Sequence, residues 1–274
     1  MSSILHISDP HFGTELPHVA QALLQLVKLQ STDAIVISGD ITQRARRKQF
    51  KAAREFIDQL ESPVKLIIPG NHDISLFNPL ARIFYPYANF QREFGKNLEP
   101  IFESSDLLII TLNTTRRYRH IDGELSSSQI KRTAALLKNA SSNQLRMVVT
   151  HQPICAIRPQ DEEDVLKRNA EAVNAWVNAG VDLILGGHIH LPYVCALEDK
   201  FNHLPRKAWA LQAGTCISSR VRQEAGNSVN LIRYSTNSLN QPDANSRTYK
   251  VERWDYQKAS NDFEKKQSHE LIRS

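Results

Sequence analysis

Short apolar runs alternate with longer segments of helical periodicity along much of the chain. The runs are β-branched or aliphatic and end at a polar residue or glycine, which is typical of buried strands. Five of them lead into polar clusters, at residues 4–7, 34–37, 64–68, 147–149 and 181–185. Apolar residues at roughly helical spacing predict helices over residues 17–30, 48–60, 126–138 and 161–179. This alternation predicts the α/β class.

Four more apolar runs carry no polar cluster, at residues 107–111, 208–211, 229–232 and 248–251. No helical pattern separates the last three, which favours antiparallel pairing in a second sheet. Residues 236–246 are predicted to form a polar loop, and the charged segment 257–274 is expected to be a frayed helix or a disordered end. We therefore expect one domain over residues 1–256, which is long enough to bury roughly three quarters of its unfolded surface, and a tail over 257–274.

The polar clusters hold most of the candidate chemistry. They are Asp9-Pro10-His11, Gly39-Asp40, Gly70-Asn71-His72-Asp73, Thr150-His151 and Gly187-His188-Ile189-His190. Singly, each is typical of a turn, because Asn and Asp tolerate left-handed backbone and bond to nearby backbone groups. Five clusters just past strand ends, in a chain with 10 His among 274 residues, favour a shared site instead. If the strands share a sheet, their carboxyl ends bring these side chains to the edge where ligands bind.

The residue types indicate metal ions. Carboxylate, amide and imidazole without thiolate suit Mn²⁺, Fe²⁺ or Zn²⁺ in a hydrolytic site more than a structural zinc knot. Residues two apart in extended chain project to the same side, so Asp9 and His11 can reach one ion or straddle two, as can His188 and His190. Asp40, a lone central carboxylate, could bridge both. The three cysteines, at positions 155, 195 and 216, are spaced too widely for a metal knuckle and form no even disulfide framework.

The ordered series Asp-x-His, Gly-Asp, Gly-Asn-His-Asp, Thr-His and Gly-His-x-His resembles the calcineurin-like metallophosphoesterases. Only Pro10, at a position that supplies no ligand, departs from the expected pattern. The Gly-Asp-Ile-Thr-Gln stretch at residues 39–43 and the Asp-Gly-Glu-Leu-x-x-x-Gln turn at 122–129 are most similar to the branch that includes cyclic-nucleotide phosphodiesterases. The resemblance implies a four-layer αββα sandwich, in which helices flank two mixed sheets.

The resemblance also implies a role for each polar residue. One metal would be held by Asp9, His11 and His190, and a second by Asn71, His151 and His188. Asp40 would bridge two divalent or mixed-valence ions of Mn, Fe or Zn. His72 would stand near the leaving-group oxygen without binding metal, and Asp73 would orient His72.

The implied activity is hydrolysis of a phosphodiester, such as a cyclic nucleotide, by a metal-bridging hydroxide. The alternatives within the resemblance are hydrolysis of a UDP-diacylglucosamine-type pyrophosphate, of a phosphomonoester, or of DNA. A nuclease is less favoured, because the net charge of +5 is spread along the chain and not concentrated on one segment. An alternative of another class is a non-catalytic metal-binding scaffold, against which the complete ligand set argues.

Substrate contacts must come from outside the ligand set. Arg44 lies four residues after Asp40, Arg116 belongs to a basic loop, and Arg220 follows a small-residue turn after a strand. Each could meet an anionic small-molecule phosphoester, and each is equally typical of a solvated or helix-capping arginine. The aromatic-rich segment 76–94 is open to three interpretations, as core, as the surface of a homodimer, or as a lipid site.

The first strand begins at Ile4 and leads directly to Asp9 and His11, so a cleaved signal peptide would remove part of the site. No stretch approaches the ~20 apolar residues of a membrane-spanning helix. We therefore expect a cytoplasmic protein with no transmembrane segment and reduced thiols.

Overall fold

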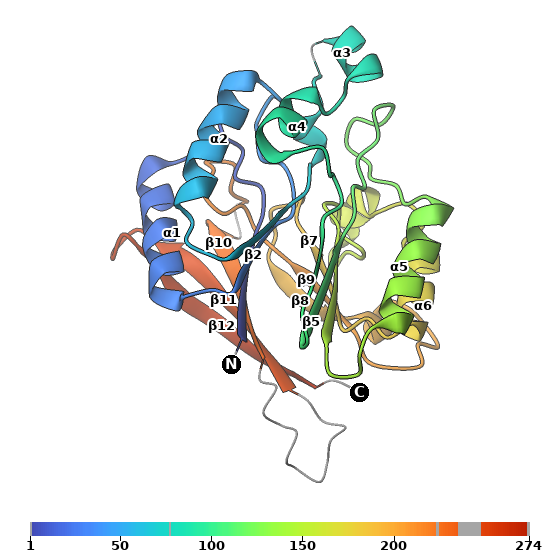
Figure 1. The fold of residues 1–274 in the computed structure, drawn as a ribbon. Coiled ribbons are helices and arrows are strands. Elements are labelled where there is room, and N and C mark those ends of the chain that lie inside the picture. Colours follow the sequence, from blue (N-terminus) through green and yellow to red (C-terminus); the bar gives the residue numbers. More distant parts are fainter. Residues whose placement is uncertain (1, 77, 223–224, 235–247, 273–274) are drawn as a thin grey trace.

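The computed structural model describes residues 2–76, 78–222, 225–234 and 248–272. Two six-stranded sheets face each other, and helices cover the outer side of each (Figure 1). The α/β class predicted from the sequence pattern and the four-layer αββα sandwich implied by the family resemblance are confirmed.

The first sheet has the strand order β12-β11-β10-β1-β2-β3. Its members are β1 (Ser2–Ile7), β2 (Ala34–Ile37), β3 (Val64–Ile67), β10 (Ser228–Tyr234), β11 (Thr248–Gln257) and β12 (Asp262–Ile272). Strands β1, β2 and β3 are parallel, whereas β10 is antiparallel to β1 and the last three strands form an antiparallel meander.

The second sheet has the order β4-β5-β6-β7-β9-β8. Its members are β4 (Ile101–Glu103), β5 (Leu107–Thr111), β6 (Leu145–Val149), β7 (Leu183–Gly186), β8 (Tyr193–Ala196) and β9 (Trp209–Gln212). Its four central strands are parallel, and the edge strands β4 and β8 are antiparallel to their neighbours.

Helices α1 (Pro17–Gln30) and α2 (Arg47–Gln59) cover the first sheet, and α5 (Ser127–Asn139) and α6 (Asn169–Asn178) cover the second (Figure 1). The short helices α3 (Pro79–Phe84) and α4 (Ala88–Phe94) follow β3. Three 3₁₀ turns complete the elements, η1 (Asn71–Asp73), η2 (Pro159–Asp164) and η3 (Leu197–Asp199). In the described part of the chain, none of the helices has the length and apolar character needed to cross a bilayer.

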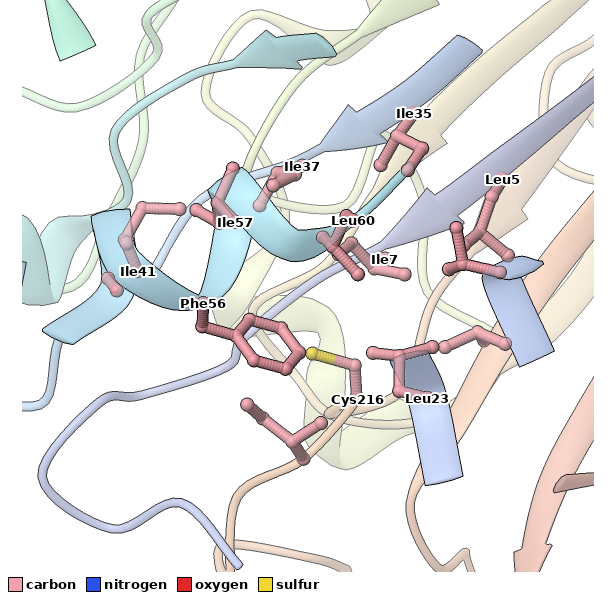
Figure 2. Packing of buried hydrophobic residues seen from close by; sticks show 14 of the residues in the cluster. Leu5, Ile7, Leu23, Ile35, Ile37, Ile41, Phe56, Ile57, Leu60 and Cys216 are labelled. Carbon is pink, nitrogen blue, oxygen red and sulfur yellow. The ribbon is translucent and has the colours of Figure 1, made fainter. Parts of the chain in front are cut away.

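Strand alternation divides the apolar residues into three layers. Leu5 and Ile7 of β1 point toward α1 and α2, while Ile4 of the same strand joins the cluster between the two sheets. Phe56 of α2 and Leu23 of α1 approach each other beside the buried thiol of Cys216 (Figure 2). The other two cysteines, Cys155 and Cys195, are also buried, and all three are free thiols in the structure.

Two expectations about secondary structure were wrong in part. Strand β9 lies parallel to β7, and β10 and β11 join β1 in the other sheet, so the last three runs do not form one antiparallel unit. The helix predicted at 161–179 is divided into η2 and α6, because Arg168 adopts left-handed backbone (φ 67°) between them.

The C-terminal segment forms strand β12 and not a frayed helix or a disordered end. Its sequence is polar because β12 is an edge strand that exposes most of its side chains, while Phe263 and Leu271 are buried. The loop expected at 236–246 lies outside the described residues.

The aromatic-rich segment 76–94 has two different halves. Phe90 is fully buried and packs with Phe94 against the core under α2, which agrees with the core interpretation. In contrast, Leu80, Phe84 and Tyr85 are between 66% and 72% exposed.

Replacing Trp176 with Ala should lower the free energy of unfolding by about 3–5 kcal/mol, because a large, fully buried ring would be lost. Its indole Nε1 also donates to the carbonyl oxygen of Ile130 across the α5–α6 interface, at 3.2 Å. Urea denaturation followed by circular dichroism measures the change. Leu29→Ala, at a side chain that is 74% exposed, is the control and should move the midpoint little.

Candidate metal centre

The five polar clusters meet although their strands belong to two sheets. Strands β1, β2 and β3 of the first sheet lead to Asp9, Asp40 and Asn71, and β6 and β7 of the second lead to the three histidines at 151, 188 and 190. We expected the clusters to meet if the five strands shared one sheet, but the strands belong to two sheets. The site lies where two facing sheets direct their carboxyl ends to the same place.

The first group of candidate ligands contains Asp9, His11 and His190, whose ligand atoms all lie within 4.8 Å of one another. The Nε2 atoms of the two histidines are 3.0 Å apart, and His190 Nε2 is 3.3 Å from Asp9 Oδ1. All three side chains are buried.

The second group contains Asp40, His151 and His188 under the same 4.8 Å criterion. The Nε2 atom of His151 lies 3.3 Å from Asp40 Oδ1 and 3.0 Å from the amide oxygen of Asn71. The ring of His188 is 5.1 Å from that of His151.

Asp40 lies between the two groups. Its Oδ1 faces His151 at 3.3 Å, and its Oδ2 faces His11 Nε2 at 3.6 Å. This carboxylate therefore offers one oxygen to each group, which is the arrangement that a bridging ligand requires.

Backbone carbonyls fix the orientation of two imidazoles. The Nδ1 atom of His151 lies 2.8 Å from the carbonyl oxygen of Ser38, and that of His190 lies 2.5 Å from the carbonyl oxygen of Arg220. Each Nδ1 must donate its hydrogen there, so each neutral ring presents the lone pair of Nε2 to the site.

When the rings are neutral, the groups that converge are thus acceptors facing acceptors, and a proton or a metal ion between them resolves the repulsion. The side-chain atoms Asp9 Oδ1 and His188 Nδ1 are buried and have no hydrogen-bond partner among the described residues, although buried polar atoms normally have one. Carboxylate, amide and imidazole ligands suit Mn, Fe or Zn ions. The residues therefore fit a pair of metal ions.

Electrostatics indicate the same demand for positive charge. Burial opposes protonation of His151, yet the carboxylates of Asp40 and Asp9 raise its pKa to about 9. Burial likewise disfavours the charged form of Asp40, but His151 and His72 hold the pKa of this carboxyl well below its usual range. Burial lowers the pKa of His11 to about 3, so this imidazole is neutral and able to bind a metal.

Backbone geometry at the site is unusual. Five candidate ligands have positive φ values between 44° and 73°, namely Asp9, His11, Asp40, His188 and His190. They are half of the ten non-glycine residues with positive φ in the described ranges. Such backbone is uncommon for non-glycine residues, although Asp and His adopt it more readily than most, and it clusters at functional sites, where surrounding contacts hold it in place.

His72 lies at the edge of the centre. Its backbone N–H donates to Asp40 Oδ1 at 2.8 Å, its Nδ1 donates to the carbonyl oxygen of Gln43 at 2.9 Å, and its ring centroid is 4.9 Å from that of His11. Its Nε2 lies 3.2 Å from an arginine nitrogen, Nη1 of Arg220. The imidazole therefore borders the metal groups with one nitrogen directed toward the basic side of the site.

The expectation that Asp73 orients His72 was wrong. The carboxylate of Asp73 accepts hydrogen bonds from the backbone N–H groups of Gly70, Ile41 and Thr42 and from the Thr42 hydroxyl, at 2.8–2.9 Å. It ties the loop after β2 to the loop after β3. Burial and the nearby Asp40 raise the pKa of Asp73 to about 7, while its backbone hydrogen bonds oppose this shift.

The three arginines predicted to contact substrate have different positions. Arg220 is in the site, since its Nη1 lies 3.4 Å from both ring nitrogens of His11. Arg44 lines a pocket together with Asn71 and His72. Arg116 is not among the described residues that line this pocket. Its guanidinium donates instead to the carbonyl oxygens of Asn113 and Thr115 and to the side chain of Gln129 near the start of α5.

Two side chains beside the candidate metal centre were not expected from the sequence. Asp164 of η2 lies 3.5 Å from His188 Nε2, and the side chain of Gln43 lies 3.2 Å from Arg220 Nη1. The acidic run 161–164 was assigned to the first turn of a helix, so its proximity to His188 was not foreseen. Gln43 belongs to the loop after Asp40, and that position was its only signal.

The fold and site define a two-sheet α/β protein with a candidate metal centre at the carboxyl ends of both sheets. A family model for calcineurin-like phosphoesterases matches residues 2–192. The chain belongs to this family.

Two sequence relatives are named as phosphodiesterases. The chain is 36% identical over 81 residues to a glycerophosphodiester phosphodiesterase of Enterobacter lignolyticus, covering 26% of this chain and 29% of the relative. It is 25% identical over 161 residues to a probable cyclic nucleotide phosphodiesterase of Ruthia magnifica, covering 58% and 62% respectively. The chain thus spans less than two thirds of both relatives.

Among solved structures, the chain resembles a dimetal phosphatase from Danio rerio. The TM-score is 0.64 at 13% sequence identity, and the match covers 100% of this chain and 99% of that one. At this identity the likeness concerns the fold alone.

Gly187 lies close to the side chains of Ser8 and Asp9. A Cβ at this position would lie 1.9 Å from Ser8 Oγ and 2.5 Å from Asp9 Oδ2, so Gly187→Ala must displace Asp9 or the backbone that carries His188. We expect a loss of about 1–3 kcal/mol in the free energy of unfolding. We also expect Mn²⁺ to raise the Tm of the wild-type protein and not that of the variant.

The matched control is Gly226→Ala, where a Cβ meets nothing within 4 Å. Calorimetry with and without Mn²⁺ measures both effects. An alanine at 187 that leaves the Mn²⁺ response intact contradicts the close approach.

Proposed function

We propose that this protein is a dinuclear metal-dependent phosphoesterase that hydrolyses phosphodiesters. The observation that carries the proposal is the convergence of two groups of acceptors on one bridging carboxylate, Asp40, with His72 beside them. The names of the two sequence relatives and the dimetal description of the zebrafish neighbour support it.

In this proposal the residues divide into two coordination sets. Asp9, His11 and His190 hold one ion, and Asn71, His151 and His188 hold the other, while Asp40 binds both. Mn, Fe and Zn all suit these ligands. Two bound ions would polarise the phosphoryl oxygens and lower the pKa of water at the site.

His72 supplies the proton for the leaving group. Because Nδ1 donates to the carbonyl of Gln43, the imidazolium form would carry its second proton on Nε2, the nitrogen that accepts from Arg220 Nη1 in this structure. From there it can be transferred to the departing oxygen. Arg220 offers positive charge to the phosphate group, and Arg44 does so from the adjoining pocket.

Asp40→Asn tests the bridging role. The substitution keeps the size of the side chain but removes the charge shared by the two groups, so we expect loss of at least one bound ion per chain. Turnover of a chromogenic phosphodiester with Mn²⁺ should fall by well over 100-fold, since even outer partners of ligands change activity by about 10–100-fold.

Metal content is measured by inductively coupled plasma mass spectrometry and folding by circular dichroism. Asp58→Asn is the matched control, because that carboxylate is 54% exposed and accepts a hydrogen bond from Arg54 on the neighbouring turn of α2. Full turnover by Asp40→Asn would sink the proposal.

His72→Ala tests the acid role. Methyl phenyl phosphate and methyl p-nitrophenyl phosphate differ in the leaving group alone, and only the poorer leaving group, phenolate, needs a proton at departure. We expect kcat to fall about 100-fold or more for the phenyl ester and far less for the nitrophenyl ester.

The exposed His18 on α1 gives the control variant, His18→Ala, which should change neither rate. Equal losses for the two esters would remove His72 from the acid role and leave it a positioning one.

A further inference from the structure

The pocket beside His72 has a volume of about 470 Å³, which is in the range of small-molecule sites. Asn71 and His72 line its end at the metal centre. Farther out, Ile74, Leu76 and Ile121 supply apolar wall. The pocket therefore joins the candidate centre to an apolar surface.

Many of the exposed apolar side chains belong to the two segments that supply Leu76 and Ile121 to this surface. Among the described residues, twelve large apolar side chains are exposed, and seven of them belong to residues 76–85 and 118–121. Soluble domains expose single apolar residues routinely, but a concentration of them beside a site marks binding.

The wall is held together by a buried arginine. The guanidinium of Arg82, on α3, donates to the carbonyl oxygens of Ser75, Arg117 and Arg119. Arg117 in turn donates to the carbonyl oxygen of Ile83, at 2.7 Å. These bonds fix α3 against the loop that carries Ile121, so the two apolar sides of the pocket are positioned relative to each other.

The charged side chains that line the pocket are positive. The lining residues among those described include Arg44, Arg82 and His120 but no carboxylate. Arg220 adds positive charge at the metal end. An anionic group is thus favoured near His72, and an apolar group is favoured between Leu76 and Ile121.

We propose that this pocket binds an apolar ester group of the substrate, so that the preferred substrates are amphiphilic phosphodiesters. Leu76 and Ile121 then determine specificity by removing the apolar group from water. This inference rests on the proposed function, which places the phosphate at the metal centre. A glycerol or other polar ester group would gain nothing from these walls.

Alkylphosphonates test the proposal by binding alone, because each carries one anionic head and one apolar chain. Methyl-, propyl- and hexylphosphonate are titrated into the Mn²⁺-loaded protein in a calorimeter. Each methylene removed from water should lower Kd about three- to fourfold. Equal affinities along the series, or no binding by any member, overturn the proposal.

The double variant Leu76→Ser/Ile121→Ser should remove most of this chain-length dependence, so that the Kd of hexylphosphonate approaches that of methylphosphonate. Both side chains are about half exposed, 45% and 54%, so folding does not depend on them. Leu29→Ser, on the outer face of α1, is the matched control. A double variant that keeps the dependence also overturns the proposal.

Phosphodiester turnover by the same preparation separates the two levels of inference. Turnover without dependence on chain length rejects this pocket and keeps the hydrolase. Chain-length dependence without turnover of any phosphodiester rejects the hydrolase and keeps the pocket as an amphiphile site.

Discussion

The structure depends on acceptors that face one another in a buried space. The Nε2 lone pair of His190 lies 3.3 Å from Asp9 Oδ1, and that of His151 lies 3.0 Å from the amide oxygen of Asn71. Both rings are committed on their other side to backbone carbonyls, so a proton or a metal ion must supply the missing positive charge. In a site of low dielectric this demand is strong, and the elevated pKa of His151 is one expression of it.

The backbone around these acceptors is arranged to hold them at some cost in stability. Left-handed conformations at Asp9 and Asp40 turn each carboxylate back toward the centre just after its strand. Asp73 offsets part of the strain, because its four hydrogen bonds fasten the loops after β2 and β3 to each other. A residue expected to serve the reaction therefore serves the scaffold that holds the reaction's ligands.

The α/β class and the placement of polar clusters just past strand ends could be predicted because both depend on local pattern, whereas the layer order and the ligand roles were implied by the family resemblance. Helix α1 spans the predicted residues, since its apolar spacing and N-terminal proline are contained in the helix itself. The partition of strands between two sheets was not predictable, because β9 and β10 have similar apolar runs and differ in their long-range partners. Arg116 and Arg220 likewise look alike in sequence, and only packing directs one into the scaffold and the other into the site.

Each proposed coordination set draws ligands from both sheets. The distances between these ligands therefore depend on how the two sheets are aligned. The apolar cluster between the sheets, with Ile4 and Val36 on one side and Met147 and Leu185 on the other, is non-directional and tolerates small sliding. Coordination bonds are directional and tolerate far less. Ions bound between the sheets would cross-link them and favour one alignment among several of similar packing energy. The relative position of the two sheets would then be set by the ligands at their carboxyl ends and not by the apolar core.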